Sequence, residues 1–289
     1  MSDLECKREE VFASEMYDER MERMAVVASW KENGKYYWAR LPVEGSDLLK
    51  PNLDDAERHE IPCIEEFWGK WDEGMLEAPL HLHGASEVYI KKPQISRYAG
   101  DAVAAELAKE DPTKTAPDLC RSKSNIAAAF RRDATMYETL RRSPHKNIAV
   151  YYGCVREGNH HFSGICMKRY RITLFEVMHA HMNEQKLNPE RISEIIEGVH
   201  AGLRHIHSLG YVHNDVTPTN IMIDEDGHPV LIDFDACRKL GDVTKGDRAG
   251  TPGYGLVPRP ERYEAENDFH MLAIIEEEMR AGKGPFSRV

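Results

Sequence analysis

The sequence predicts an α+β fold of two lobes, one small and rich in strands and one larger and helical, preceded by an N-terminal extension. Three observations carry this prediction. The short runs "EVYIKKP", "NIAVYYGC" and "FSGICMKRY" combine aromatic and β-branched residues, which is typical of strands. Apolar residues at helical spacing follow Asn188-Pro189 and predict a long amphipathic helix that runs up to Gly210. The stretch "NIMIDEDGHPVLIDF" predicts a hairpin that turns at Asp226-Gly227.

The N-terminal extension is expected to cover residues 1–84. Residues 4–24 are densely charged, and we interpret them as a helix. Two aromatic and β-branched runs then flank Asn33-Gly34, the pair that favours a tight hairpin turn, so "VVASWKENGKYYWARLP" predicts a hairpin. Residues 44–79 are polar and punctuated by prolines, which indicates an irregular connection with one short helix.

The composition excludes several classes of partner and compartment. A net charge of -11 without a dense Lys/Arg stripe would repel a polyanion, so we expect no nucleic-acid partner. The longest apolar runs fall far short of a bilayer span, so we expect no membrane partner either. The charged start does not resemble a secretory signal, and the 6 cysteines form no C-x-x-C pair. Reduced thiols in the cytoplasm or nucleus are the expected setting.

The stretch from Tyr211 to Ala236 places chemically useful side chains at informative intervals. Asp215 and Asn220 stand as D-x-x-x-x-N, and the hairpin that follows is expected to fold Asp233 back beside them. Phosphoryl transfer requires a carboxylate to orient the attacking hydroxyl, and a carboxylate with an amide to hold Mg²⁺ on the phosphates. We therefore predict Asp215 and Asn220 as catalytic residues, with Asn220 and Asp233 as the metal ligands.

At these residues the chain resembles the eukaryotic protein kinases, whose catalytic-loop and metal-binding motifs are matched by "HNDVTPTN" and "DFD". "VYIK" precedes these motifs, and "GTPGY", "RPE" and "ENDFHMLAI" follow in the expected order. Features such as "YIKKP" and "PHKN" are closest in type to the reduced kinase-like proteins of filamentous fungi. The resemblance implies a bilobal protein-kinase-like fold. Its small lobe would cover 85–168, and its helical large lobe would cover 169–289, shortened after the helix at 267–281.

The resemblance also implies an ATP-dependent phosphotransferase of the serine/threonine type that uses Mg²⁺ and acts on a protein or small-molecule hydroxyl. Lys91, or else Lys92, would bind the phosphates of ATP. Its partner acid would be Asp133 or else Glu138, and because aspartate is shorter than glutamate, a longer or absent ion pair is expected. Met167 completes the expected nucleotide-binding residues.

Other positions match the family or depart from it. Asp268 is expected to accept hydrogen bonds from backbone N–H groups near residues 213 and 214. Asn214 replaces the arginine that receives an activating phosphate in many kinases, so that control is expected to be missing. Thr217 replaces a lysine that steadies the transferred phosphate, which predicts slower turnover. Asp235 replaces the glycine of D-F-G, where a non-glycine residue restricts positive φ.

Three functions remain open on the sequence alone. No G-x-G-x-x-G precedes "VYIK", so the grip on nucleotide phosphates is expected to be weak. A kinase-like phosphotransferase is favoured, a pseudokinase that acts as a binding scaffold is the first alternative, and a small-molecule kinase of the aminoglycoside phosphotransferase type is the second. "GTPGY" and "RPE" favour the protein-kinase branch over the small-molecule one.

Overall fold

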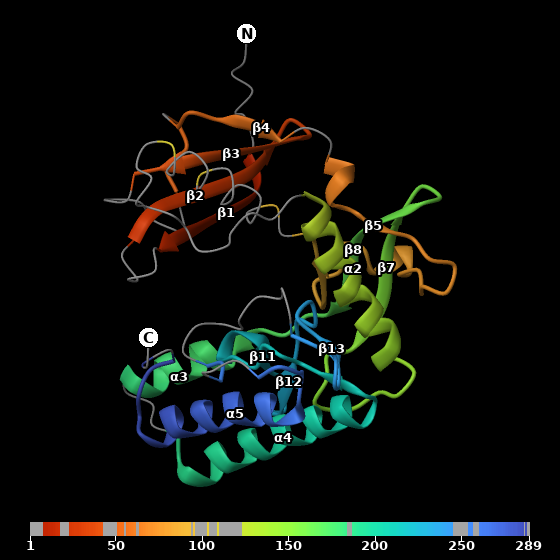
Figure 1. The fold of residues 1–289 in the computed structure, drawn as a ribbon. Helices are drawn as coiled ribbons and strands as arrows, with labels where there is room; N and C mark the ends of the chain where they lie inside the picture. The colour runs from red at the N-terminus through yellow and green to blue at the C-terminus, as the bar shows by residue number, and fades with distance from the viewer. Residues whose placement is uncertain are drawn as a thin grey trace. The chain divides into compact units, whose positions relative to one another are not determined.

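The chain divides into two compact units in the computed structural model, one formed by residues 1–70 and 92–130 and the other by residues 71–91 and 131–289 (Figure 1). The predicted boundaries after residues 84 and 168 remain a prediction. The structure describes residues 8–17, 23–42, 51–54, 56–61, 64–93, 95, 103, 109, 123–183, 187–244, 254–256, 260–285 and 287.

The first unit contains an antiparallel sheet whose four strands follow one another in chain order. They are β1 (Arg8–Tyr17), β2 (Arg23–Glu32), β3 (Lys35–Leu41) and β4 (His59–Ile61). The hairpin predicted around Asn33-Gly34 is confirmed, because β2 pairs with β3 and the two turn residues have φ of 52° and 79°. Two positive φ values in succession are the signature of a type I′ turn.

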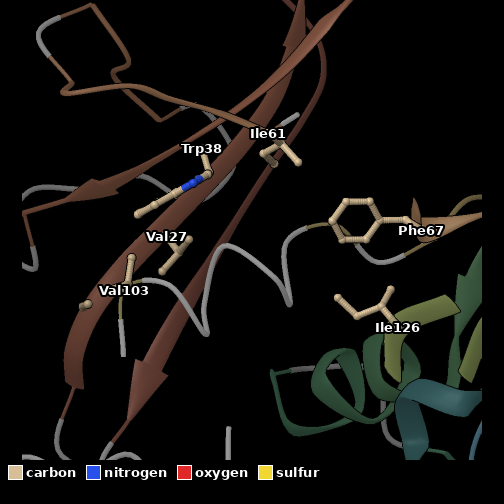
Figure 2. Close-up of a cluster of buried hydrophobic side chains, with 7 residues drawn as sticks. Val27, Trp38, Ile61, Phe67, Val103 and Ile126 are labelled. Atoms are coloured by element: carbon tan, nitrogen blue, oxygen red, sulfur yellow. The ribbon is translucent and has the colours of Figure 1, made fainter. Parts of the chain in front are cut away.

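The helix predicted for residues 4–24 is wrong, since Arg8–Tyr17 is a strand paired with β2. The physical reason lies in β2, where every residue from Ala25 to Trp30 is buried. Val27 belongs to one apolar cluster, shown in Figure 2, whereas its neighbours Val26 and Ala28 belong to a second cluster. A strand buried on both faces needs hydrogen-bond partners at both edges, because unpaired buried backbone groups are costly. β3 pairs with one edge of β2, and β1 supplies the partner at the other edge.

The connection predicted between residues 44 and 79 is largely irregular, with more local structure than expected. It contains β4, a single 3-10 turn η1 (Ile64–Phe67) and the two-residue strand β5 (Gly69–Lys70). Residues 43–50, 55 and 62–63 lie outside the described part of the chain. A second 3-10 turn, η2 (Leu80–Leu82), follows in the second unit.

The strands predicted for the small lobe are confirmed in the second unit. β6 (Val88–Lys91) and β7 (Tyr151–Glu157) both pair antiparallel with β8 (His161–Lys168), so β8 lies between them. β6 ends two residues before Pro93, as expected for a residue without an N–H for the ladder. Helix α2 (Lys123–Leu140) follows β6 in the chain, and the division between the two units falls within it, after Phe130.

The helical part of the second unit consists of α3 (Leu174–Asn183), α4 (Pro189–Ser208) and α5 (Ala265–Arg280). Asn188 caps α4 as predicted, because its side chain accepts the N–H of Arg191 at 2.7 Å. No helix in the described part of the chain combines the length and apolarity needed to cross a membrane.

Short strands lie before and between these helices in the chain. The predicted hairpin is confirmed as β11 (Ile221–Ile223) and β12 (Pro229–Leu231), and β11 also pairs with β9 (Ile172–Thr173). β10 (Tyr211–Val212) pairs with β13 (Arg238–Lys239), and the 3-10 turn η3 (Pro218–Asn220) precedes β11. These short elements hold the loop between β10 and η3 in place.

Replacing Gly198 with alanine is expected to destabilise the protein by about 1–3 kcal/mol, because α4 packs closely on β12 at this point. A Cβ on Gly198 would lie 2.5 Å from Cγ of Pro229, a rigid ring atom. This cost outweighs the gain of about 1 kcal/mol in helix propensity. Denaturant unfolding measures the change, with Glu197→Ala at a neighbouring exposed position as the control. An unchanged or raised stability of Gly198→Ala would contradict the packing.

Candidate active site

The loop between β10 and η3 brings Asp215 and Asn220 into direct contact. Nδ2 of Asn220 donates to the carbonyl oxygen of Asp215 at 3.0 Å and to its Oδ2 at 2.9 Å. The hairpin returns to the same place, because the N–H of Ile232 donates to the carbonyl of Asn220 at 3.0 Å. Asp233 is therefore the next residue after this backbone contact with Asn220.

Lys91 links the small sheet to this segment. Its Nζ lies 2.6 Å from Oδ2 of Asp133 on α2 and 2.8 Å from Oδ1 of Asp233. These contacts belong to Lys91 rather than to Lys92, and to Asp133 rather than to Glu138. The expectation of a longer or absent ion pair is wrong, because α2 lies close enough to β6 for the shorter aspartate to reach.

The charges around Lys91 are strongly coupled. Burial alone would lower the pKa of Lys91, but the carboxylates of Asp133, Asp233 and Asp235 raise it well above its ordinary value, so the lysine stays protonated. Burial raises the pKa of Asp133 to about 6, and nearby Asp233 and Asp235 add to this effect while Lys91 opposes it. Three carboxylates around one ammonium leave an excess of negative charge, which suits a site for cations.

Asp133 has a second partner, which fixes the backbone next to Asp233. Its Oδ1 accepts the N–H of Phe234 at 2.9 Å. Asp233, the preceding residue, has φ of 62°, a left-handed conformation that is uncommon for non-glycine residues but that aspartate adopts more readily than most. In this segment the positive φ falls on Asp233 and not on Asp235, so aspartate in place of the family's glycine at 235 meets no left-handed strain.

Three aromatic side chains contact one another in sequence, from α2 to the loop between β10 and η3. Tyr137 meets Phe234 edge-on at 4.9 Å between centroids, and Phe234 lies 5.3 Å from the ring of His213. Tyr137 is almost fully buried, and its Oη lies 3.7 Å from Sδ of Met167. The sequence prediction missed Tyr137, although its position four residues after Asp133 places both on one face of α2.

Asp268 links α5 to the loop between β10 and η3, as predicted. Its two carboxylate oxygens accept the N–H groups of His213 and Asn214 at 2.8 and 2.7 Å, and Nε2 of His207 lies 2.8 Å from Oδ2. The carboxylate is fully buried. Asn214 has φ of 65°, and asparagine tolerates this left-handed conformation better than most residues.

Met167 lies in β8 directly across from Tyr89 in β6 and is buried. Tyr89 itself is 46% exposed, and the guanidinium of Arg169 lies over its ring at 5.8 Å. The same guanidinium donates to the carbonyl oxygens of Ser86 and Val88 at 2.9 and 2.8 Å. Arg169 therefore fastens the start of β6 to the segment after β8, a connection that the sequence prediction did not include.

The family model for the protein kinase domain matches residues 113–289, and the chain belongs to this family. The α+β fold expected from the resemblance is confirmed with it. Lys91 lies upstream of the matched residues, so its place in the site comes from the geometry alone.

Several curated kinases are similar to this chain over part of their length. Serine/threonine-protein kinase CLA4 of Candida albicans is 27% identical over 195 residues, which cover 65% of this chain and 19% of that protein. RUNKEL of Arabidopsis thaliana, also a serine/threonine-protein kinase, is 34% identical over 107 residues, 35% of this chain and 8% of that protein. Serine/threonine-protein kinase/endoribonuclease IRE1 of Hypocrea jecorina is 33% identical over 123 residues, 38% of this chain and 10% of that protein. The chain spans about a fifth or less of these relatives.

Proposed function

We propose that this chain is an ATP-dependent phosphotransferase of the serine/threonine protein kinase type. The observation that carries the proposal is the position of Nζ of Lys91 between Asp133 and Asp233, at 2.6 and 2.8 Å. This contact joins β6, α2 and the metal-binding motif, the three parts that phosphoryl transfer requires together. The relatives named as serine/threonine-protein kinases support the type of acceptor.

Asp215 would orient the acceptor hydroxyl and take its proton as the phosphoryl group is transferred. The hydrogen bond from Nδ2 of Asn220 to Oδ2 of Asp215 fixes the direction of this carboxylate. Lys91 would hold the phosphates of the nucleotide in line with that hydroxyl, because its protonated ammonium is anchored from two sides. Each residue thus positions a reactant, which is the main demand of this chemistry.

The residues present fit Mg²⁺. Nδ2 of Asn220 makes both of its contacts with Asp215. The amide oxygen, Oδ1, points in a different direction and would serve as a metal ligand. Together with the carboxylate of Asp233 it offers the oxygen ligands that this hard cation prefers. When bound, Mg²⁺ would neutralise charge on the phosphates. Asn220 and Asp233 would hold it, while Lys91 keeps Asp233 in place.

A pseudokinase is the second candidate, and two observations favour it. In the part of the chain that the structure describes, β6 is an edge strand, with no glycine-rich hairpin paired beyond it to cover phosphates. Thr217 stands where the family has a lysine and bonds to Oγ1 of Thr219 at 2.9 Å. The missing hairpin removes backbone N–H donors from around a nucleotide, and Thr217 in place of lysine removes a positive charge. A scaffold would therefore keep the fold while binding nucleotide weakly or not at all.

A thermal-shift titration with ATP, with and without Mg²⁺, tests the proposal. Wild type is expected to be stabilised by millimolar ATP only when Mg²⁺ is present, because a ligand that binds the native state raises the melting temperature. Asp233→Asn preserves the shape and the left-handed backbone but removes the charge, and we expect about tenfold or more loss of Mg²⁺-dependent affinity. Asp226→Asn, an exposed change in the same hairpin, is the matched control. A wild-type protein that shows no shift would favour the pseudokinase.

A further inference from the structure

A segment upstream of the residues matched by the family model packs on the edge of β7. We call residues 71–78 the strap. The carbonyl of Leu76 accepts the N–H of Cys154 at 2.7 Å, and the N–H of Ala78 donates to the carbonyl of Cys154 at 2.9 Å. Glu77 thereby forms a parallel bridge with Cys154. The N–H of Trp71 also donates to the carbonyl of His160, at 2.8 Å. The strap thus adds a single parallel bridge to the edge of β7.

Gly153 permits this close approach. A Cβ built on it would lie 2.6 Å from the backbone nitrogen of Ala78 and 2.8 Å from the carbonyl oxygen of Leu76. Both are backbone atoms, which cannot rotate away as the end of a side chain would. Gly153 also has φ of 125°, a conformation that side chains rarely adopt. Only glycine at this position lets the strap lie against β7.

The strap is also fastened to α2, at points on both sides of Asp133. The N–H of Leu76 donates to Oε1 of Glu138 at 2.7 Å, and Asp72 forms a looser pair with Arg131, 3.9 Å from Oδ2 to Nη2. Glu138 is buried, and it also accepts the hydroxyl of Tyr151 at 2.7 Å. The Glu138 carboxylate on α2 therefore accepts hydrogen bonds from both the strap and β7.

We propose that the strap and Glu138 set the position of α2, so that Asp133 reaches both Lys91 and the N–H of Phe234. Glu138 is a positioning residue, because it acts on the site through the helix that carries Asp133, about 7.5 Å away along the helix axis. This inference rests on the proposed function for its importance in catalysis. An aspartate is one methylene shorter than glutamate, so a small outward movement of α2 would break both contacts.

At the site itself, Lys91 and the N–H of Phe234 hold Asp133 against repulsion from neighbouring carboxylates. The carboxylates of Asp233 and Asp235 raise the pKa of Asp133, which means that they repel its charged form. Asn214 carries no charge that could bind a phosphorylated activation segment, so such a contact does not order the site. Glu138 and the strap add a second restraint on α2, one turn or more beyond Asp133.

Amide hydrogen exchange with mass spectrometry tests this inference without requiring enzyme activity. Gly153→Ala should displace the strap from the β7 side, and Glu138→Ala should release it from α2. In both variants we expect the N–H groups of Leu76 and Phe234 to exchange at least about tenfold faster. Glu138→Gln keeps an acceptor oxygen and should restore protection of Phe234. Gly158→Ala is the control, since it also has positive φ but an added Cβ there meets no atom within 4 Å.

The outcomes separate the two proposals. Faster exchange at Leu76 with unchanged protection of Phe234 would show that the strap does not position α2. Unchanged exchange at Leu76 in Gly153→Ala would overturn the inference as well, because the strap would not depend on that close approach. If Gly153→Ala does not fold, Glu138→Ala and Glu138→Gln carry the test. Failure of wild type to bind nucleotide would remove the proposed function and leave the exchange result standing.

Discussion

Replacing Asp215 with asparagine is expected to lower phosphate transfer by about 10²- to 10⁴-fold and to leave nucleotide affinity nearly unchanged. The substitution keeps the size of the side chain and an acceptor for Nδ2 of Asn220, so the loop should retain its shape. It removes the carboxylate that would orient the hydroxyl and take its proton. The effect should therefore appear in the rate constant rather than in binding.

Radiolabelled phosphate transfer to the protein itself, or to a generic basic protein, at high ATP measures this effect. Asp226→Asn makes the same chemical change at an exposed position in the β11–β12 hairpin and should transfer phosphate at the wild-type rate. Equal transfer by Asp215→Asn and wild type would remove Asp215 from the chemistry. Equal silence of both proteins, without nucleotide binding, would select the pseudokinase.

Asp268→Ala is expected to lower the free energy of unfolding by about 3–5 kcal/mol. The carboxylate is fully buried and accepts two backbone N–H groups of the catalytic loop and Nε2 of His207. Its removal leaves these donors without an acceptor in a site that water does not reach. The expected loss is a large part of the 5–15 kcal/mol typical of native proteins.

Denaturant unfolding followed by circular dichroism measures the loss at Asp268. Glu266→Ala provides a close control, because it removes the same charge from the first turn of α5 at an exposed position. This control should change stability by less than about 1 kcal/mol. An Asp268→Ala protein that unfolds at the wild-type midpoint would show that the three contacts contribute little.

The parts of the fold that follow from local chemistry were predictable from the sequence. Turns at Asn33-Gly34 and Asp226-Gly227 and the cap at Asn188 depend on a few adjacent residues, and all three occur as expected. β1 was not predictable in this way, because its strand conformation depends on hydrogen bonding to β2, which is buried and requires a second partner. The many charged residues in 4–24 indicate that the segment is exposed to solvent, but they do not show whether it is a helix or a strand. Strand pairing depends on residues that are distant in sequence.

The candidate site shows the same division. Asp215 and Asn220 are five residues apart, and their contact follows from that spacing. The partner of Lys91 lies 42 residues away, so the choice between Asp133 and Glu138 required the position of α2. Glu138 points instead to the strap and to Tyr151. A motif identifies which residue types are present, but only packing decides which of two neighbouring acids faces the lysine.

The division of the chain between its two units has a practical consequence for fragments of this protein. The polypeptide leaves the first unit after residue 70, returns to it after Lys91, and leaves it again after Phe130. Lys91 and Asp133 thus stand within three residues of two of these crossings. The second unit is discontinuous, so a fragment that starts at residue 113, where the family match begins, would contain Asp133 and Asp233 but neither the lysine between them nor the strap. Excision of the unit would require two pieces joined by a new linker.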